Sequence, residues 1–413
     1  MATPAPSRTH DLVLYGASGF VGKLTAKYLA ESAPPGTKIA LGGRSKAKLE
    51  AVRSELPAVA RDWPIVIADS QDDAALAKLA ASTTVVVTTV GPYQRYGLPL
   101  VKACADAGTH YADLTGEVLF MRQSIDAANA RAKETGARIV HTCGFDSIPS
   151  DLGVLTAYEY AQEIGAGTLE DVTFVVSMSG GISGGTIDSM RAQLEQVAAD
   201  KSHAKTIFSP YSLTDDRESE PDVGKQPDPK GVSKDPDSGA WLAPFVMSQV
   251  NTRVVRRSNA LRGHAYGRRF KYQEYMRAGS GPAGAVTAGV VVGALGGLMG
   301  GMSFSPTRKL LDRVLPKPGE GPSEKARDKG YFKVTITAGT SSGKKVRVKV
   351  KASGDPGYKA TAVMLGEAGL SLALDGDALP DAAGVLTPAT AMGNVLTDRL
   401  RAAGQTYDAE TVL

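Results

Sequence analysis

The residues best suited to chemistry form a glycine-rich turn near the start of the chain. The turn separates an apolar run at 11–15 from a helix-like stretch at 23–31, and it reads Gly16, Ala17, Ser18, Gly19, Phe20, Val21, Gly22. In a strand, turn and helix of this kind, glycines let backbone N–H groups approach a pyrophosphate, which then lies at the helix N-terminus. The turn therefore predicts a dinucleotide site, although a tight turn also needs glycine for conformational reasons alone.

Two basic residues after the second predicted strand indicate which dinucleotide binds. The run 38–42 leads into Gly43-Arg44-Ser45, where an NAD site would carry an acidic residue for the ribose 2′-hydroxyl. Arg44, with Lys48 one helical turn further on, can make charge-assisted hydrogen bonds to a 2′-phosphate. We therefore predict NADPH as the cofactor, and the alternative is that Arg44 is only a solvated residue at a helix start.

Loops after later strands supply the remaining candidates. Gly91 and Pro92 are expected to approach the nicotinamide half of the cofactor, and Tyr93 is the first candidate for a proton donor, with a packing tyrosine as the alternative. His141 is a second candidate proton donor or a structural hydrogen-bond partner. Gly144 is assigned to cofactor binding.

The same loops contain two acidic residues and a helix start. Asp113 and Asp146 are expected to hold backbone amides without touching substrate. The helix that begins near Pro149 would present N–H groups to developing negative charge, such as an enolate oxygen.

Several catalytic motifs are absent from the sequence. It contains no Tyr-x-x-x-Lys pair, no His-Glu-x-x-His, no nucleophile elbow and no Walker sequence, and Cys104 and Cys143 lack metal-ligand spacing. We expect no metal, reduced cysteines, and chemistry supplied by the cofactor.

The candidate loops belong to an α/β arrangement. From residue 11 to about 150, β-rich runs alternate with helical patterns, which is typical of a Rossmann-type doubly wound parallel sheet. We predict a disordered lead-in at 1–10 and an NADP-binding domain at 11–155. The net charge of +4 on 413 residues gives no reason to expect nucleic acid as a partner.

The rest of the chain predicts a second, α+β domain at 156–385 with an antiparallel sheet. Its expected strands are 171–178, 250–257 and 268–277, with a hairpin of 331–338 and 344–352. A polar stretch at 209–240 predicts a long surface loop, either a lid or an insertion. The segment 386–413 is predicted to be a C-terminal helix that returns to the first domain, with Thr387 as its cap.

A glycine-rich apolar segment at 283–302 has no charged residue between Arg277 and Arg308. Small residues recur every four positions, as in helices that pack in lipid: Ala285, Gly289, Gly293, Gly297, Gly301. Three interpretations stay open: a buried helix or homodimer contact, a segment that touches a membrane or a long acyl chain, and a membrane span.

A basic run precedes this segment. Eight Lys or Arg residues and one acidic residue, Glu274, lie within 253–277. A basic face of this kind would receive an acidic carrier domain or an anionic lipid surface, and a solvated sheet face is the alternative.

Five motifs together resemble the saccharopine-dehydrogenase-like family, and within it the mycobacterial trans-acting enoyl reductases, over nearly the whole chain. They are the turn 16–22, Thr89-Val-Gly-Pro-Tyr93, Tyr111-Ala-Asp-Leu-Thr-Gly-Glu117, Gly144-Phe-Asp-Ser-Ile-Pro-Ser-Asp151 and Pro316-Lys-Pro-Gly-Glu-Gly-Pro-Ser323. The resemblance implies reduction of a carbon–carbon double bond in a polyketide or fatty acyl chain, for a synthase without its own enoyl-reductase step. The implied end products are cell-wall lipids of the phthiocerol dimycocerosate and phenolic glycolipid type.

The expected function is NADPH-dependent reduction of a carrier- or CoA-linked enoyl thioester, in the cytoplasm and peripherally at the inner face of the plasma membrane. A C–N oxidoreductase and a lipid-associated nucleotide-binding protein without turnover are the alternatives. No basic cluster suited to an amino-diacid substrate is found, which favours an apolar substrate.

Overall fold

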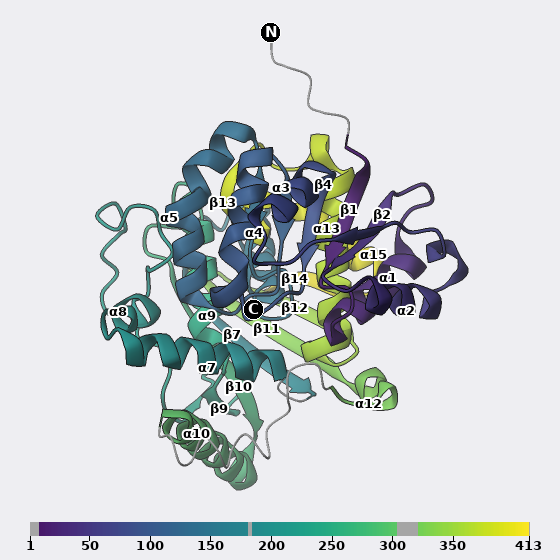
Figure 1. The fold of residues 1–413 in the computed structure, drawn as a ribbon. Coiled ribbons are helices and arrows are strands. Elements are labelled where there is room, and N and C mark those ends of the chain that lie inside the picture. The colour runs from purple at the N-terminus through teal and green to yellow at the C-terminus, as the bar shows by residue number, and fades with distance from the viewer. Residues whose placement is uncertain (1–7, 181–183, 304–320, 413) are drawn as a thin grey trace.

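Two seven-stranded sheets form the framework of the molecule (Figure 1). The structure is a computed structural model that describes residues 8–180, 184–303 and 321–412. Residues 1–7 of the predicted lead-in and residues 316–320 of the motif ending at Ser323 lie outside the described residues.

The first sheet is parallel throughout and confirms the predicted doubly wound sheet. Its spatial order is β13 (Gly384–Leu386), β6 (Arg138–Val140), β5 (His110–Ala112), β4 (Thr83–Thr88), β1 (His10–Tyr15), β2 (Ile39–Gly43) and β3 (Ile65–Ile67). The helices that follow its strands are α1 (Phe20–Ser32), α2 (Lys46–Glu55), α3 (Asp73–Ala81), α4 (Tyr93–Ala107) and α5 (Val118–Thr135), with a 3-10 turn at Ala58–Ala60. The central strands β1 and β4 are apolar and buried, as expected for a sheet covered on both faces.

The second sheet is mixed. Its order is β14 (Thr406–Val412), β12 (Lys345–Ser353), β11 (Tyr331–Thr340), β7 (Leu169–Ser179), β10 (Lys271–Gly279), β9 (Trp241–Pro244) and β8 (Ser233–Lys234). The predicted hairpin is confirmed as β11 and β12, whose Val346, Val348 and Val350 are buried. The sequence predicted an antiparallel sheet. Strands β7 and β10 pair in parallel, however, so the sheet is only partly antiparallel.

Two helices connect the sheets. Helix α6 (Ile148–Glu163) leaves the first sheet after β6 and packs on β11, β12 and β14 of the second. Helix α13 (Thr361–Leu374), preceded by a π-turn at Pro356–Ala360, packs on β1, β4 and β5 of the first sheet. Helix α13 therefore packs on the first sheet, although the predicted boundaries assigned its residues to the second domain.

The expected strand at 250–257 is wrong, because this segment lies in helix α9 (Ser248–Leu261). Val250, Val254 and Val255 have the spacing of one helix face, and the polar residues between them, through Asn259, are buried as well. The expected basic face is also wrong, since three of its arginines, Arg253, Arg256 and Arg257, are buried in α9.

The loop 209–240 supplies partners for these buried arginines. Asp228 binds both terminal nitrogens of Arg253, at 2.8 Å in the bond from Nη2 to Oδ2. Asp215 accepts from Arg257 at 2.8 Å. The loop is thereby fastened to α9 by ion pairs whose arginines are buried, and removing a carboxylate partner would leave a buried charge unpaired.

The C-terminal segment was predicted to be a helix, but it ends in a strand. Strand β13 adds to the edge of the first sheet, α14 (Pro388–Ala391) and α15 (Gly393–Ala402) follow, and β14 then pairs with β12 of the second sheet. Thr387 caps α14 with a capping box, as predicted. The segment thus contributes an edge strand to each sheet.

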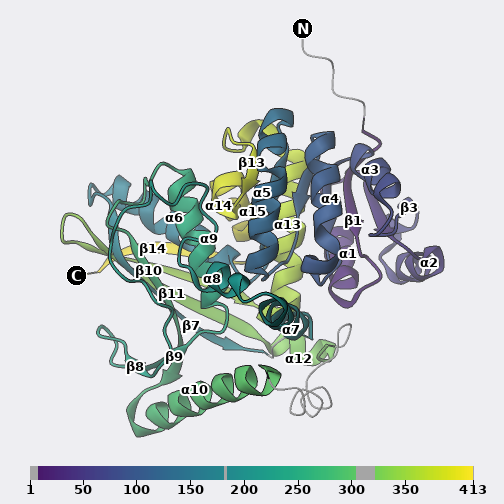
Figure 2. The same cartoon turned by 60° about the vertical axis from the view of Figure 1, so that its left-hand side comes forward.

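The glycine-rich segment forms helix α10 (Gly281–Ser303), which runs along the lower edge of the molecule beside β9 and β10 (Figure 2). Gly284 and Ala288 are buried, whereas Val286 and Val290 are 68% and 65% exposed. By length and composition, Gly281–Leu298 could cross a membrane, and only 11% of this window is buried. The interpretation as a buried helix is therefore wrong. The remaining helices are α7 (Gly184–Ala199), α8 (Ser202–Phe208) and α12 (Glu324–Lys329).

Candidate active site

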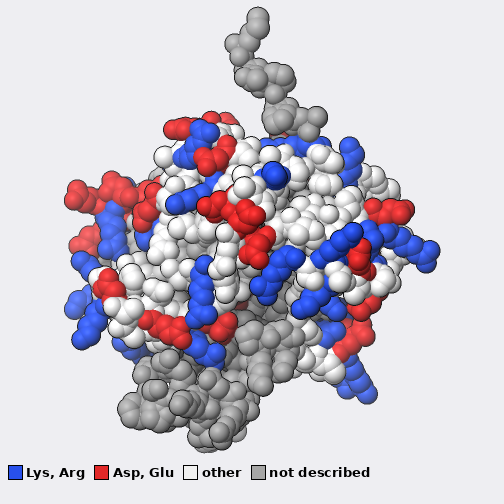
Figure 3. All heavy atoms as spheres, in the orientation of Figure 1, with Lys and Arg blue, Asp and Glu red and all other residues white. Residues whose placement is uncertain are grey.

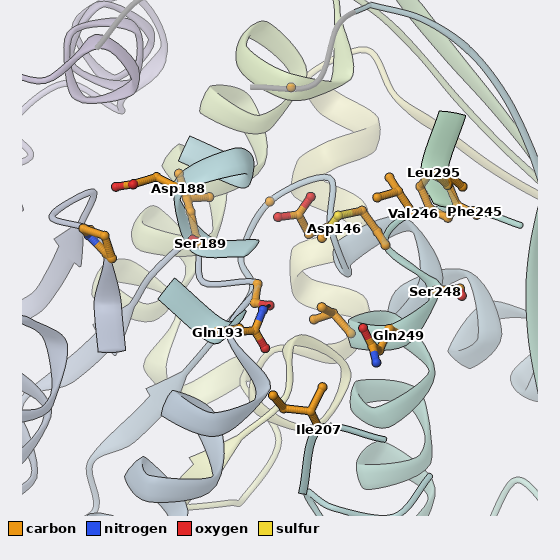
Figure 4. A pocket seen from close by; sticks show the side chains of 18 of the residues that line it. Asp146, Asp188, Ser189, Gln193, Ile207, Phe245, Val246, Ser248, Gln249 and Leu295 are labelled. Atoms are coloured by element: carbon orange, nitrogen blue, oxygen red, sulfur yellow. Dashed lines mark hydrogen bonds between the residues drawn. The ribbon is translucent and has the colours of Figure 1, made fainter. Parts of the chain in front are cut away.

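A cavity of about 790 Å³ lies between the carboxyl ends of the first sheet and the second sheet. One end is lined by Gly19, Phe20 and Val21 of the glycine turn, and the other by Val292, Leu295 and Gly296 of α10. Helices α7 and α8 and the start of α9 form the walls between these ends (Figure 4). The cavity therefore joins the predicted dinucleotide turn to the apolar helix.

The glycine turn is shaped for a phosphate. Gly16 has φ of +89°, which favours glycine, and a Cβ at Gly22 would overlap the Gly16 carbonyl oxygen. Helix α1 starts directly after Gly19 without a side-chain cap and without an acid in its first turn. The first N–H groups of α1 therefore have neither an intrahelical partner nor a competing carboxylate, which is the arrangement that binds a pyrophosphate.

Arg44 and Lys48 are exposed immediately after β2, where a 2′-phosphate would lie. Helix α2 has no acidic residue in its first turn. The residues present therefore fit a phosphorylated ribose. Burial and the charge of Asp69 raise the pKa of the nearby Tyr15 to about 12, and the positive charge of Arg44 opposes this increase.

Gly91, Pro92 and Gly144 line the cavity, as expected for residues that approach the nicotinamide half of a cofactor. The Gly91–Pro92 peptide bond is cis. Gly144 lies close to Leu114, whose Cδ2 would be 2.8 Å from a Cβ at this position. Ser18, which belongs to the glycine turn, is not among the described residues that line the cavity.

The structure does not support the proton-donor role predicted for Tyr93. Its ring lines the cavity, but its hydroxyl donates to the Thr88 carbonyl oxygen at 3.1 Å and accepts from the Leu114 N–H at 3.2 Å. Burial raises the pKa of the Tyr93 phenol well above its ordinary value. The hydroxyl proton is therefore bound to the backbone and weakly acidic.

His141 takes the structural role that the sequence left as its alternative, and its contacts do not support it as a proton donor. Its Nδ1 lies 2.7 Å from Asp113 Oδ2, and its Nε2 lies 2.8 Å from Ser124 Oγ. It is buried and is absent from the described lining of the cavity. Both ring nitrogens are used within the first sheet and its helices.

Asp113 and Asp146 differ from each other, although the sequence predicts the same role for both. Asp113 accepts from the N–H groups of Thr115 and Thr142 at 3.0 and 3.2 Å, as predicted. Asp146 makes no such bond within the described part of the chain, and its carboxyl points into the cavity (Figure 4). Burial raises the pKa of Asp146 to about 7.

Three backbone N–H groups of the loop that carries Asp146, before the predicted helix start, are not free to stabilise an enolate. The N–H of Phe145 donates to Thr361 Oγ1 at 3.0 Å, and those of Ser147 and Ile148 donate to the Gly144 carbonyl oxygen at 3.3 and 2.9 Å. These three donors are therefore already used.

The walls of the cavity are mainly apolar. Its described apolar side chains include Leu114, Leu194, Val197, Ile207, Phe245, Val246, Met247, Val250 and Val292. Lys230 is the one basic side chain among the described lining residues. This lining suits an acyl chain and offers no set of cations for several carboxylates. Within the described ranges, no cluster of three or more His, Cys, Asp or Glu could hold a metal ion.

A Rossmann-type sheet, a phosphate-binding turn and an adjoining apolar cavity define a dinucleotide-dependent oxidoreductase. Residues 12–140 match the saccharopine dehydrogenase NADP binding domain, so the cofactor is NADPH. The chain belongs to the saccharopine-dehydrogenase-like family, in the branch of the trans-acting enoyl reductases.

Two curated relatives place the chain in this branch. A Mycobacterium tuberculosis protein, provisionally named a trans-acting enoyl reductase, is 52% identical over 411 residues, which cover 98% of this chain and 97% of the relative. A Mycobacterium ulcerans protein named trans-acting enoyl reductase is 46% identical over 406 residues, covering 96% of this chain and 97% of the relative.

Two solved structures share the fold. Saccharopine dehydrogenase (L-Glu forming) from Saccharomyces cerevisiae has a TM-score of 0.55 at 13% identity, with 97% of this chain and 99% of that chain covered. Homospermidine synthase from Legionella pneumophila, in complex with NAD, has a TM-score of 0.53 at 9% identity, with 97% and 91% covered.

Proposed function

We propose that the chain uses NADPH to reduce the carbon–carbon double bond of an α,β-unsaturated acyl thioester. The observation that carries the proposal is the continuity of one cavity from Gly19 and Phe20, at the dinucleotide turn, to Val292 and Leu295 of α10. A cofactor held at the turn and an acyl chain that extends toward α10 would share this cavity. The names of the relatives describe the same reaction class.

The chain's own residues bind and orient the reactants. The turn 16–22 would hold the pyrophosphate, and Arg44 and Lys48 would hold the 2′-phosphate. When bound, NADPH supplies the hydride that reduces the β-carbon. The apolar walls exclude water and position the acyl chain.

The proposed substrate is a long acyl or polyketide intermediate linked to CoA or to a carrier domain. A mainly apolar lining favours it over the polar amino acids of C–N oxidoreductases, because an unpaired buried polar group is costly. We propose a separate polyketide synthase as the partner, since the relatives are named as acting in trans. The proposed products are cell-wall lipids of the phthiocerol dimycocerosate and phenolic glycolipid type.

The test is NADPH oxidation by the full chain with trans-2-enoyl thioesters of increasing chain length. We expect turnover that improves with chain length until the cavity is filled. A parallel panel of amino acids with 2-oxo acids tests C–N chemistry, and turnover there alone would overturn the proposal. NADPH binding without turnover on either panel would favour the non-catalytic alternative. The lipid profile of a deletion strain then identifies the double bond that persists.

The protein is proposed to act in the cytoplasm, peripherally on the inner face of the plasma membrane. The exposed side of α10 carries Val286, Val290 and small residues without charge, and its inner side lines the cavity. A bilayer surface would cover the exposed side and lie next to the apolar end of the cavity. By contrast, Lys, Arg, Asp and Glu are interspersed over the described face in Figure 3.

Vesicle co-sedimentation tests this location. Val290→Glu should reduce binding to phospholipid vesicles at least about tenfold, because a charge is costly in the acyl region. Val59→Glu is the matched control, since Val59 is 66% exposed at a site remote from α10 in sequence, on the 3-10 turn after α2. Equal binding by the two variants contradicts the proposal. A dimer in solution that Val290→Glu dissociates would instead assign this helix face to a second copy.

A further inference from the structure

The carboxyl of Asp146 has a position that the cofactor-binding residues leave unexplained. It lies on the loop between β6 and α6, at the carboxyl ends of the parallel strands, where ligands of such sheets bind. It lines the same cavity as Gly19, Gly91 and Pro92. Asp146 is therefore positioned to contact a substrate that lies between the cofactor and α10.

The surroundings of Asp146 keep its carboxyl available. Gly116 and Met247 are its neighbours: a Cβ added at Gly116 would lie 3.7 Å from Asp146 Oδ2 and 3.3 Å from Met247 Cε. No hydrogen bond to its side chain forms within residues 8–180, 184–303 and 321–412, and its side chain is only partly exposed. A carboxyl flanked by a glycine and a methionine can release its proton to a bound molecule without breaking a protein contact.

Other acidic groups of the cavity are engaged elsewhere. Asp188 pairs with Arg191 at 3.5 Å, and Asp228 binds Arg253. The hydroxyl of Ser189 donates to Glu117 at 2.8 Å, and that of Tyr93 donates to Thr88. Asp146 is thus the acidic side chain of the cavity without such an engagement among the described residues.

We infer that Asp146 is the catalytic acid that protonates the α-carbon during reduction of the enoyl thioester. The inference rests on the proposed function. The hydride supplied by NADPH forms the new C–H bond at the β-carbon, and the electron pair of the double bond moves to the α-carbon and thioester carbonyl. The O–H bond of Asp146 then breaks as the α-carbon C–H bond forms. Asp146 is left as a carboxylate and regains its proton from water.

The protonation state agrees with this role. Burial alone raises the pKa of Asp146 to about 7, and no charged group of the described elements around it adds to or opposes the shift. The carboxyl is therefore substantially protonated near neutral pH, as a general acid must be.

The test compares the full-length wild type with Asp146→Asn, which keeps the shape and removes the proton. Infrared difference spectroscopy of the protein without cofactor should show protonated-carboxyl absorption that titrates near pH 7 in the wild type, and Asp146→Asn should lose the part contributed by Asp146 while keeping that of Glu274. NADPH affinity, measured by calorimetry, should change less than about threefold. The rate of reduction of trans-2-hexadecenoyl-CoA should fall roughly 10²–10⁴-fold. Asp146→Glu should recover part of the rate.

A second readout separates this role from a structural one. In the wild type, kcat/KM should fall above pH 7 and reduction in D₂O should place deuterium at the α-carbon with one stereochemistry. Asp146→Asn should lose both the pH limb and the stereochemistry. Glu274→Gln is the control for the loss of a buried carboxyl outside the cavity. Burial raises the pKa of Glu274 to about 7, as it does for Asp146, but Glu274 is not among the described residues that line the cavity. A full rate in Asp146→Asn overturns the inference while the proposed function stands, and an inactive wild type overturns both.

Discussion

The hydroxyl of Ser189 on α7 donates a hydrogen bond of 2.8 Å to Oε1 of Glu117, at the start of α5. The same carboxylate accepts from the backbone N–H groups of Tyr93 and Gln94 at 3.1 and 2.7 Å. Glu117 therefore connects the helix that covers the cavity to the first turn of α4. Gln193 adds a longer bond of 3.4 Å from α7 to the Gly116 carbonyl oxygen.

Ser189→Ala should loosen α7 over the cavity. A hydrogen bond to a charged group contributes about 1.5–3 kcal/mol, so amide exchange in α7 should accelerate roughly tenfold or more. The KM for the acyl substrate should rise, whereas NADPH affinity should stay unchanged. Ser219→Ala is the control, since it removes a hydroxyl that donates to the Asp216 carbonyl oxygen in an exposed loop. Unchanged exchange in α7 would show that Glu117 does not fasten this helix.

Tyr93→Phe should affect stability more than chemistry. The variant leaves the N–H of Leu114 without its acceptor, which lowers the free energy of unfolding by about 1–3 kcal/mol. The rate of enoyl reduction should remain within a few-fold of the wild type. Urea denaturation and steady-state kinetics measure the two effects. A hundredfold lower kcat with intact NADPH binding would instead make Tyr93 the proton donor.

Arg44→Glu should discriminate between the two nicotinamide cofactors. Loss of a charge-assisted contact with the 2′-phosphate costs about 1.5–3 kcal/mol, so NADPH should bind roughly 10- to 100-fold more weakly. NADH affinity should change little. Arg61→Glu makes the same charge change before β3, at the amino ends of the parallel strands and not at the carboxyl ends where Arg44 lies, and should affect neither cofactor. An equal loss for NADPH and NADH would mean that Arg44 does not recognise the phosphate.

Buried carboxyls should make the fold less stable as the pH rises toward neutral. Burial raises the pKa of Asp151 to about 6 and that of Glu274 to about 7, above their ordinary values of 3.8 and 4.5. Between the ordinary and raised values the folded state binds more protons than the unfolded state, so increasing pH favours unfolding. The slope of unfolding free energy against pH should be shallower in Glu274→Gln than in the wild type between pH 4.5 and 7. Parallel denaturation curves over that interval would contradict the assignment.

The sequence is sufficient to predict the elements that follow a simple period. The alternation of Val346, Val348 and Val350 predicts β12, and the glycine turn before 23–31 predicts the cofactor-binding end of the cavity. Helix α9 also has such a period in Val250, Val254 and Val255, which the predicted strand did not take into account, whereas the burial of its arginines could not be predicted because their acceptors lie in a loop distant in sequence.

The site shows the same limit. Asp113, His141 and Asp146 all follow strands of the first sheet, so their positions predict proximity to a ligand. Their roles depend on which hydrogen bonds the fold completes. Asp113 and His141 bind each other at 2.7 Å, whereas Asp146 remains directed at the cavity. No sequence period carries that information. The exposure of Val286 and Val290 likewise depends on which neighbours reach α10.

The final thirty or so residues have a consequence for biogenesis. Strand β13 closes one edge of the parallel sheet, and β14 closes an edge of the mixed sheet, so a chain without them leaves β6 and β12 as bare edges. An uncovered sheet margin is a template for wrong pairing with another polypeptide. We therefore expect a chain truncated before Thr406 to expose the edge of β12, and one truncated before Gly384 to expose the edge of β6 as well, and each to aggregate more readily than the full chain.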